Sequence, residues 1–157
     1  MADLQIAVLT CSDTRGEAED TAGRALSELI AGRGWTLSGY QVVPDDKLRI
    51  EAAIVEMADG GADVILTCGG TGLGPRDVTP EATLDVCERA VPGIAEHMRA
   101  ESLRVTGRAM LSRATAAVRG RTLVVNLPGS EKAAIECFGF VADQFEHAVK
   151  MMNGGGH

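Results

Sequence analysis

The sequence predicts an α/β protein: a three-layer α/β/α domain with a mostly parallel central sheet. Short apolar runs rich in β-branched residues alternate along the chain with amphipathic helical segments, which is the order of βαβ units. The apolar runs mostly lack the polar alternation of a half-exposed strand, so they are expected to be buried on both faces, as parallel strands are. At 157 residues, the chain has the length of one domain.

The first half of the chain is predicted to contain three strands separated by two helices. The predicted strands are Leu4–Thr10, Thr36–Val43 and Asp63–Cys68. Apolar residues at helical spacing predict a helix over Ala22–Ile30, which Gly34 ends, and a second helix over 48–58. Asp20 or Thr21 is expected to cap the first helix, because a short side chain with an oxygen atom accepts from the free N–H groups of the first turn.

The second half continues the alternation, with a less regular stretch in the middle. Residues 79–81 (Thr-Pro-Glu) predict a helix start with the threonine as N-cap, and this helix is expected to run to about Ala90. A further helix is expected over 94–103, whereas 106–119 shows no clear period. Arg121–Asn126 is the last predicted strand.

A final helix is expected after Ser130, and it completes the domain. Its predicted apolar face consists of Ile135, Phe138, Ala142, Phe145 and Val149. Residues 1–153 are therefore expected to form a single domain, and residues 154–157, three glycines and a histidine, a disordered tail.

Composition and charge narrow the class of function. The chain is 45% hydrophobic and carries 22 Asp and Glu against 15 Lys and Arg, a net charge of -7. This balance disfavours nucleic acid and anionic membranes as partners, and no apolar run approaches the ~20 residues of a membrane span. The four cysteines show no C-x-x-C spacing and the N-terminus shows no secretory signal, so reduced thiols and a cytoplasmic location are expected.

Polar residues and glycines follow each strand that is predicted to be parallel. In an open α/β sheet, ligands bind outside the carboxyl ends of the strands, where such loops converge. The loops are Cys11–Asp13, Pro44–Asp46, Gly69–Asp77 and Leu127–Ser130. The sequence therefore predicts a ligand site built from these four loops.

The glycine-rich loop, Gly69–Asp77, is the most informative of the four. Glycines allow the backbone to approach a ligand closely, and successive N–H groups can form a nest for an anion beside the N-terminus of the helix expected at Thr79. No Gly-Lys-Ser or Gly-Lys-Thr follows, and Pro75 stands where the dinucleotide fingerprint has its third glycine. From this pattern alone, phosphate binding and a flexible connection are equally open interpretations.

Asp13, Asp45 and Asp77 each lie shortly after a predicted strand. Carboxylates that converge in a cleft commonly hold Mg²⁺ together with the phosphate groups of a substrate. A single loop aspartate is more often a helix cap or a turn residue, and Asp45 or Asp46 fits that description. Three aspartates at neighbouring strand ends favour the metal site.

Other polar residues near these loops have two interpretations each. Ser12 and Ser130 can bind a ligand or cap a turn or helix. Arg76 and Lys132 can offset phosphate charge or lie in solvent. Arginines within 99–113 form either a basic lip beside the site or separate exposed positions on helix faces. They are Arg99, Arg104, Arg108 and Arg113.

Taken together and in this order, these segments resemble the MogA/MoaB family of molybdenum-cofactor biosynthesis proteins. The matching segments are Ser12-Asp13, Asp20–Gly23, Pro44-Asp45, Gly69–Gly72, Arg76–Ala82 and Leu127–Ser130. They span nearly the whole chain. The combination is specific, although a Gly-Gly-Thr-Gly run alone is not.

The resemblance implies a three-layer domain that binds molybdopterin and assembles as a homotrimer or as a dimer of trimers. Active members of the family use Mg²⁺ and ATP to adenylylate molybdopterin and release pyrophosphate, and the product passes to a downstream molybdate-insertion protein. Some MoaB-type members resemble the enzyme without its activity, so a non-catalytic molybdopterin-binding paralogue is the alternative. A nucleotide-dependent oxidoreductase and a redox switch through Cys11 and Cys68 are weaker alternatives.

The resemblance also assigns roles, residue by residue. It assigns catalysis and Mg²⁺ binding to Asp45 and Asp77. It assigns the pterin- and nucleotide-binding surface to Ser12, Asp13, Gly69, Gly70, Thr71, Gly72, Thr79, Pro80, Pro128, Gly129 and Ser130. Both aspartates follow the pattern of the active members, which favours an adenylyltransferase over the non-catalytic alternative.

Overall fold

A six-stranded sheet in the order β2-β1-β3-β6-β5-β4 lies at the centre of the computed structural model, which describes residues 3–156. Four neighbouring strands are parallel: β2 (Thr36–Val43), β1 (Gln5–Cys11), β3 (Val64–Cys68) and β6 (Thr122–Leu127). Strand β5 (Ala116–Arg119) is antiparallel to β6, and the two-residue β4 (Arg89–Ala90) is antiparallel to β5. The prediction of a mostly parallel sheet is confirmed.

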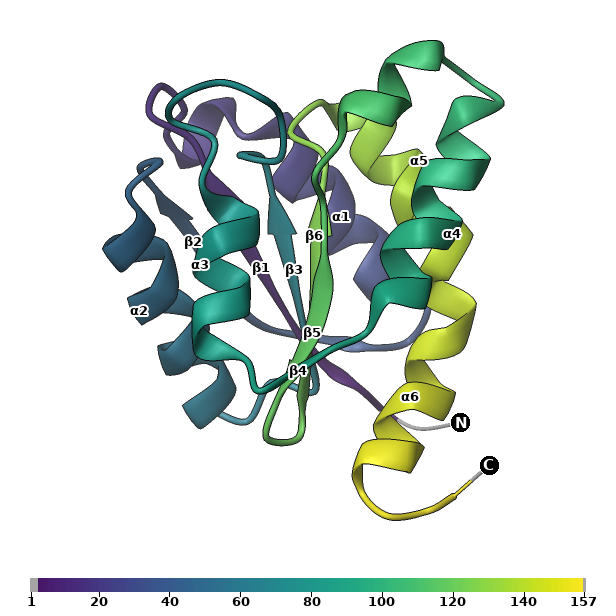
Figure 1. The fold of residues 1–157 in the computed structure, drawn as a ribbon. Helices are drawn as coiled ribbons and strands as arrows, with labels where there is room; N and C mark the ends of the chain where they lie inside the picture. The colour runs from purple at the N-terminus through teal and green to yellow at the C-terminus, as the bar shows by residue number, and fades with distance from the viewer. Residues whose placement is uncertain (1–2, 157) are drawn as a thin grey trace.

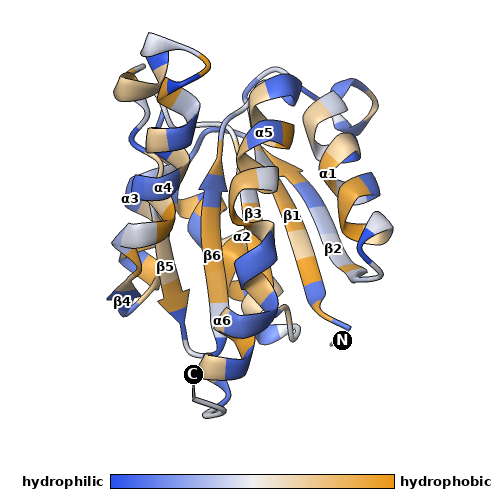
Figure 2. Ribbon diagram, turned by 90° about the vertical axis from the view of Figure 1, so that its right-hand side faces the viewer, coloured by the Kyte–Doolittle hydropathy of each residue, from blue (hydrophilic) through white to orange (hydrophobic). Residues whose placement is uncertain are grey.

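Helices cover both faces of the sheet (Figure 1). One face carries α1 (Thr21–Gly32), α4 (Pro92–Leu103), α5 (Glu131–Val141) and α6 (Phe145–Met152), and the other carries α2 (Lys47–Asp59) and α3 (Thr79–Val86). The apolar strands lie between these two layers (Figure 2). Two separate buried clusters, one on each face, form the core. The predicted three-layer α/β/α arrangement is therefore confirmed.

The segment after the glycine-rich loop differs from its prediction in two respects. The N-cap of α3 is Val78, and Thr79 is the first helical residue, because the Val78 carbonyl oxygen accepts the first helical hydrogen bond, from the Ala82 N–H. Helix α3 ends at Val86 rather than near Ala90, since Arg89 and Ala90 pair with β5 as an edge strand. The predicted cap and the predicted helix end were therefore wrong.

The irregular stretch over 106–119 contains a 3-10 helix, η2 (Gly107–Leu111), followed by β5. The predicted final helix is divided into α5 and α6 by a 3-10 turn, η3 (Ala142–Gln144). On α5, the buried positions are Ala134, Cys137, Phe138 and Val141. Ile135 lies one position off this stripe and is 38% exposed, so its assignment to the apolar face was wrong.

Asp20 confirms the predicted cap of α1 and also anchors the helix to the sheet. Its carboxylate accepts from the Gly23 N–H as the N-cap and from the hydroxyls of Thr10 and Tyr40. The residue is fully buried, and a buried carboxylate is tolerated where donors surround it. This pair of strand contacts places the start of α1 directly against β1 and β2.

The described end of the chain continues beyond α6. The N–H groups of Gly154 and Gly155 donate to carbonyl oxygens of the last turn of α6, and residue 157 lies outside the described residues. Disorder of the 154–157 tail stays a prediction. Within residues 3–156, no helix is long and apolar enough to cross a membrane.

Candidate functional site

The four loops predicted to form the site meet at the carboxyl end of the parallel strands, at the top of Figure 1. Backbone hydrogen bonds join neighbouring loops: the Ser12 N–H donates to the Val43 carbonyl oxygen, and the Gly69 N–H to that of Leu127. Gly69 and Gly129 approach so closely that a Cβ added at Gly129 would lie 3.3 Å from the Gly69 Cα. The predicted convergence is confirmed.

Asp13 and Asp45 hold the first two loops together by reciprocal hydrogen bonds. The Asp13 N–H donates to Asp45 Oδ2 and the Asp45 N–H to Asp13 Oδ1, both at 3.0 Å. The Arg76 guanidinium from the glycine-rich loop donates to both oxygens of Asp13 at 3.0 Å. Asp13 is thus occupied by protein contacts and links three loops.

Asp45 has one carboxylate oxygen without such a contact. Its Oδ1 atom is buried and has no hydrogen-bond partner among the described residues. Burial raises the pKa of the Asp45 carboxyl, and the charges of Asp13 and Asp77 raise it further, against the N–H of Asp13 and the charge of Arg76. An unpartnered carboxylate oxygen in this position is available to a cation.

Two glycines allow the sharp turn from β3 into the glycine-rich loop. Gly69 has φ +103° and Gly70 has φ +71°, a region that residues with a Cβ rarely adopt. A Cβ at Gly70 would lie 2.2 Å from Thr79 Oγ1 and 3.3 Å from Asp45 Oδ1. Only glycine therefore lets the backbone pass between the Asp45 carboxylate and the start of α3.

Asp77 closes the other end of the same loop. Its Oδ2 atom accepts from the Gly74 N–H at 2.9 Å, and its own N–H donates to the Gly74 carbonyl oxygen at 3.0 Å. A Cβ at Gly72 would also lie 2.9 Å from Asp77 Oδ2. The carboxylates of Asp45 and Asp77 therefore border one short stretch of glycine backbone.

Several backbone N–H groups of this loop are free to bind a ligand. Within residues 3–156, nothing accepts from the N–H groups of Gly72, Leu73 and Val78. Successive unpaired N–H groups form an anion-binding nest. The structure thus favours anion binding over a merely flexible connection.

A cavity of about 280 Å³ lies beside the loop. Thr71 and Gly72 line it from the glycine-rich loop, Pro128 from the β6–α5 loop, and Met98 and Arg99 from α4. Ligand pockets for drug-sized molecules start at roughly 300 Å³, so this cavity has room for a single ring system.

The other predicted surface residues have structural contacts. The Ser12 hydroxyl accepts from the N–H groups of Thr14 and Arg15, and the Ser130 hydroxyl caps α5 by accepting from the Ala133 N–H. Thr79 and Pro80 are buried beneath the loop. The Thr79 hydroxyl lies beside the Cys11 thiol, a weak partner, and forms no hydrogen bond of ordinary geometry with the described residues.

Two arginines, Arg15 and Arg113, make contacts with these loops that were not predicted from the sequence. The Arg15 guanidinium donates to the Gly129 carbonyl oxygen at 2.7 Å, joining the first loop to the fourth. Arg113 bonds to the glycine-rich loop itself. Arg15 follows Ser12-Asp13 by two residues, which is a usable signal, whereas the sequence marked Arg113 only as one of the arginines within 99–113.

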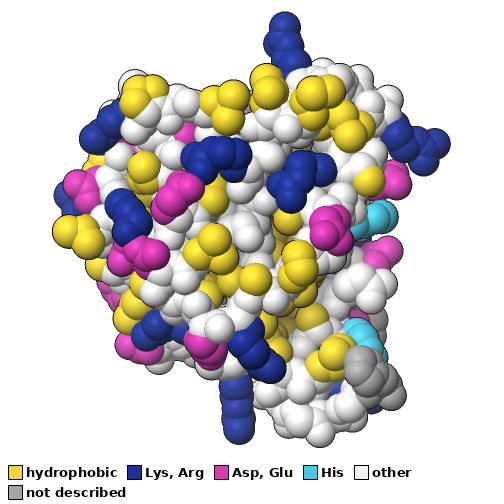
Figure 3. Space-filling view, in the orientation of Figure 1, with side chains coloured by type: hydrophobic (Ala, Val, Ile, Leu, Met, Phe, Trp, Pro, Cys, Tyr) yellow, Lys and Arg dark blue, Asp and Glu magenta, His cyan; other side chains and the backbone are white. Residues whose placement is uncertain are grey.

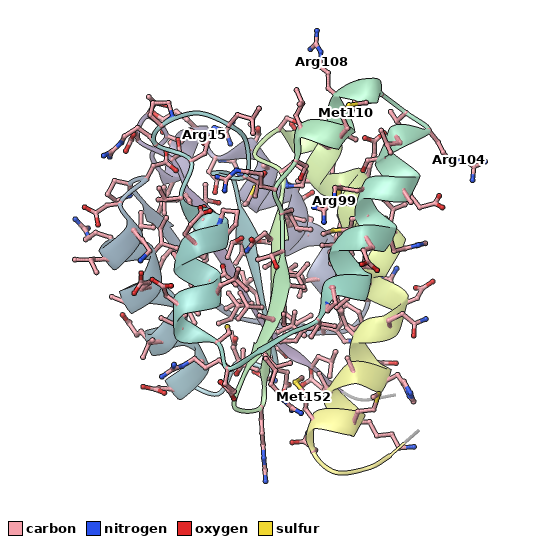
Figure 4. All side chains as sticks on the ribbon, in the orientation of Figure 1. Arg15, Arg99, Arg104, Arg108, Met110 and Met152 are labelled. Atoms are coloured by element: carbon pink, nitrogen blue, oxygen red, sulfur yellow. The ribbon has the colours of Figure 1, made fainter. Side chains whose placement is uncertain are left out.

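The four arginines of 99–113 do not form a continuous basic lip. Figure 4 shows Arg104 and Arg108 projecting away from the molecule, whereas Arg99 turns inward from α4. Arg113 also turns inward, to the loop carbonyls. Lys132 is 79% exposed and pairs with Glu136 on α5. Arg76 pairs with the Asp13 carboxylate while its side chain is 62% exposed, and its role in offsetting phosphate charge stays a prediction.

Cys11 and Cys68 lie buried at their strand ends as free thiols. Burial raises the pKa of each to about 12. A thiol with so high a pKa is protonated at neutral pH and poorly nucleophilic. These features disfavour the redox-switch alternative.

Most of the chain matches one known protein family. Residues 7–147 match the family described as "Probable molybdopterin binding domain". This chain belongs to that family. It is 37% identical over 161 residues to a protein of Helicobacter pylori strain J99 named molybdopterin adenylyltransferase, with 98% of this chain and 90% of the relative covered.

Solved structures from both branches of the MogA/MoaB family share the fold. The molybdopterin biosynthesis enzyme MoaB from Thermus thermophilus has a TM-score of 0.88 at 47% identity, covering 96% of this chain and 97% of that chain. The molybdopterin biosynthesis Mog protein from Mycobacterium ulcerans has a TM-score of 0.88 at 32% identity, covering 95% and 99%. The MogA/MoaB resemblance is confirmed, and the chain takes part in molybdenum-cofactor biosynthesis.

The contacts of Asp13 and Asp45 predict the order in which their carboxyls titrate. We expect the Asp45 carboxyl to titrate at a higher pH than that of Asp13, because burial raises the pKa of Asp45, whereas hydrogen bonds from Arg76 and from the Asp45 N–H lower that of Asp13. NMR of protein labelled with carbon-13 at the aspartate carboxyls measures both values. The reverse order would contradict the contacts described above.

The Asp45 and Asp13 carboxyls make the free energy of unfolding depend on pH in opposite directions. The stabilising contribution of Asp45 is complete below the ordinary aspartate pKa of ~3.9 and is lost as the pH rises through its raised folded value. That of Asp13 is present above the ordinary value and is lost as the pH falls through its lowered folded value. Unfolding measured from about pH 3 to pH 6, in wild type and in Asp45→Asn, reports the Asp45 contribution as their difference.

Proposed function

We propose that this chain is a molybdopterin adenylyltransferase that uses Mg²⁺ and ATP. The observation that carries the proposal is the placement of the Asp45 and Asp77 carboxylates beside a loop with unpaired N–H groups. A reaction between two phosphate groups needs a cation site and an anion site close together. The name of the Helicobacter pylori relative, which covers 98% of this chain, agrees with this chemistry.

In the proposed reaction, an oxygen of the terminal phosphate of molybdopterin attacks the α-phosphorus of ATP. A new P–O bond forms, the bond from the α-phosphorus to the pyrophosphate oxygen breaks, and the electron pair leaves with pyrophosphate. A phosphate monoester is already ionised near neutral pH, so the site needs no strong general base. Positioning and charge stabilisation therefore supply the catalysis.

Asp45 and Asp77 would hold a magnesium ion together with phosphate oxygens of the nucleotide. Asp45 Oδ1 is buried without a partner among the described residues, and the Asp77 carboxylate borders the same glycine backbone. Within residues 3–156, no group of three or more His, Cys, Asp or Glu side chains is placed to hold a metal. Mg²⁺ commonly takes one or two carboxylates plus phosphate oxygens, and it would neutralise phosphate charge when bound.

The remaining groups of the site have matching tasks in this proposal. The N–H groups of Gly72 and Leu73 would bind phosphate oxygens, and the 280 Å³ cavity next to Gly72 would take the ring system of one substrate. The surface predicted for pterin and nucleotide, from Ser12 to Ser130, surrounds these two features. Its individual binding roles stay predictions.

Incubation with molybdopterin and Mg-ATP tests the proposal. Adenylyl-molybdopterin and pyrophosphate are expected in equal amounts by liquid chromatography and mass spectrometry, and EDTA is expected to stop their formation. Molybdopterin binding by isothermal titration without any product would identify the non-catalytic paralogue instead. If the protein formed no product and did not bind molybdopterin, the proposed function would be wrong.

We further propose a homotrimer, or a dimer of trimers, in the cytoplasm. Exposed apolar side chains gather around the end of α4 and η2, seen along the upper right edge of Figure 3, which supports an interface between subunits. They are Leu103, Val105, Met110 and Leu111. Free cysteines support a reducing compartment. Light scattering after size exclusion would contradict the assembly if it gave a monomer mass.

A further inference from the structure

Arg113 lies just before β5 and contacts both ends of the glycine-rich loop. Its Nε atom donates to the Gly72 carbonyl oxygen at 2.8 Å and its Nη2 atom to that of Asp77 at 2.7 Å. Its backbone N–H donates to the Thr71 carbonyl oxygen at 2.9 Å, and its Nη1 atom to Glu81 Oε2 on α3 at 2.5 Å. One residue thus joins the loop, the start of α3 and the approach to β5.

These contacts determine which way the loop peptides face. In a trans peptide the carbonyl oxygen and the following N–H point in opposite directions, and none of the described peptide bonds is cis. The carbonyls of Thr71, Gly72 and Asp77 point to Arg113, so the N–H groups of the next residues, Gly72, Leu73 and Val78, point away from it. These three N–H groups have no acceptor in the described part of the chain, and the same holds for those of Gly70, Thr71 and Arg76 in this loop.

Arg99 on α4 in turn holds the segment that carries Arg113. Its Nη1 atom donates to the carbonyl oxygens of Ser112 at 3.3 Å and Ala114 at 2.8 Å, on either side of Arg113. Figure 4 shows its side chain turned from α4 toward the middle of the molecule. The helix layer therefore holds the segment that carries Arg113 through contacts that do not involve the glycine-rich loop.

We propose that Arg113 is a positioning residue that keeps the glycine-rich loop with its N–H groups turned toward an anionic ligand, the phosphates of a nucleotide. The proposal rests on the function proposed above for the identity of that ligand. The guanidinium is already occupied by two carbonyls and Glu81, so Arg113 acts through the loop and not as a direct phosphate ligand. Arginine suits this task because its planar fork presents five donors, whereas lysine offers one compact charge.

Arg119 on β5 provides a matched control, because it bonds to the same helix, α3. Its Nη1 atom donates to the Val86 carbonyl oxygen at 2.7 Å, the same kind of contact at the opposite end of α3. Arg119→Ala therefore removes an arginine–carbonyl bond from α3 without touching the loop. Comparing it with Arg113→Ala and Arg113→Lys separates loop positioning from a general loss of packing.

Three measurements on the full chain test the proposal. Amide hydrogen exchange of peptides covering 69–78 is expected to accelerate in both Arg113 variants and to stay unchanged in Arg119→Ala. Binding of inorganic pyrophosphate with Mg²⁺ by isothermal titration is expected to weaken in the same two variants only. For adenylylation, a rise in the KM for ATP and a fall in kcat are expected to lower kcat/KM by about 10²-fold, the cost of a misplaced group.

Arg113→Lys keeps the charge and most of the side chain, so it is expected to melt close to wild type and still to show the exchange and KM changes. Wild-type exchange, pyrophosphate binding and KM in Arg113→Lys would overturn the proposal, as would equal changes in Arg119→Ala. If the wild-type protein formed no adenylylated product, the proposed function would fail. The exchange and pyrophosphate measurements would still decide the role of Arg113.

Discussion

Asp77→Asn is expected to lower the rate of adenylyl-molybdopterin formation by about 10³-fold and to leave the fold intact. The Asn amide oxygen can accept the Gly74 N–H bond that Asp77 Oδ2 accepts at 2.9 Å, so the loop keeps its shape. The substitution removes the negative charge that would face the cation. Product formed per unit time measures the rate, and partial molybdopterin binding is expected to remain.

Asp46→Asn is the control for this experiment. Asp46 neighbours Asp45, but its carboxylate caps α2 by accepting from the Arg49 N–H, and asparagine is an equally good cap. The adenylylation rate and the melting temperature of Asp46→Asn are expected to match those of the wild type. Full activity of Asp77→Asn would show that Asp77 has no role in the mechanism. If Asp46→Asn lost activity to the same extent, the cause would be the change in net charge and not the position of Asp77.

Gly69→Ala is expected to destabilise the protein by roughly 3 kcal/mol, which corresponds to a fall in Tm of about 10 °C. Gly69 has φ +103°, and its added Cβ would lie 2.5 Å from the Cys11 carbonyl oxygen. That oxygen is backbone at the end of β1, so the strand ends themselves must shift. Adenylylation is expected to fall as well, because the shift displaces the glycine-rich loop.

Gly139→Ala is the control that shows whether the loss of stability is specific to Gly69 or follows any replacement of glycine by alanine. Gly139 lies on α5, and an added Cβ would meet nothing within 4 Å. At an exposed position within a helix, alanine is more stable than glycine by up to ~1 kcal/mol. The Tm of this variant is therefore expected to be unchanged or higher. Thermal unfolding followed by circular dichroism measures both variants, and an unchanged Tm in Gly69→Ala would contradict the close approach of the strand ends.

The parallel strands were predictable because burial on both faces leaves a sequence signal. Strand β2 has the predicted bounds, Thr36–Val43, and β1, β3 and β6 differ from theirs by one residue at one or both ends. Strands β4 and β5 were not predictable, since the two residues of β4 owe their conformation to pairing with β5. The 3-10 turn within the last helix likewise has no local signal, while Phe138 and Phe145 still both contact the Trp35 ring.

The candidate site also has one part that could be predicted from the sequence and one part that could not. Its loops could be located from the sequence, because glycines, prolines and aspartates mark strand ends and the carboxyl ends of parallel strands must converge. The partners of each side chain could not. Ser12 and Ser130 accept hydrogen bonds from nearby N–H groups, Asp13 pairs with Arg76, and one oxygen of Asp45 has no hydrogen-bond partner among residues 3–156.

The sequence by itself determined the three-layer α/β fold, the family and the four loops that meet at the candidate site. All of these depend on residue types at short spacing, which determine backbone conformation and burial locally. Only the tertiary structure decided that Arg113, 36 residues after Asp77, turns the glycine-rich loop outward, and that Arg15 joins the first loop to the fourth. Such contacts depend on the directions of carbonyl groups after packing, and no pattern along the chain encodes those directions.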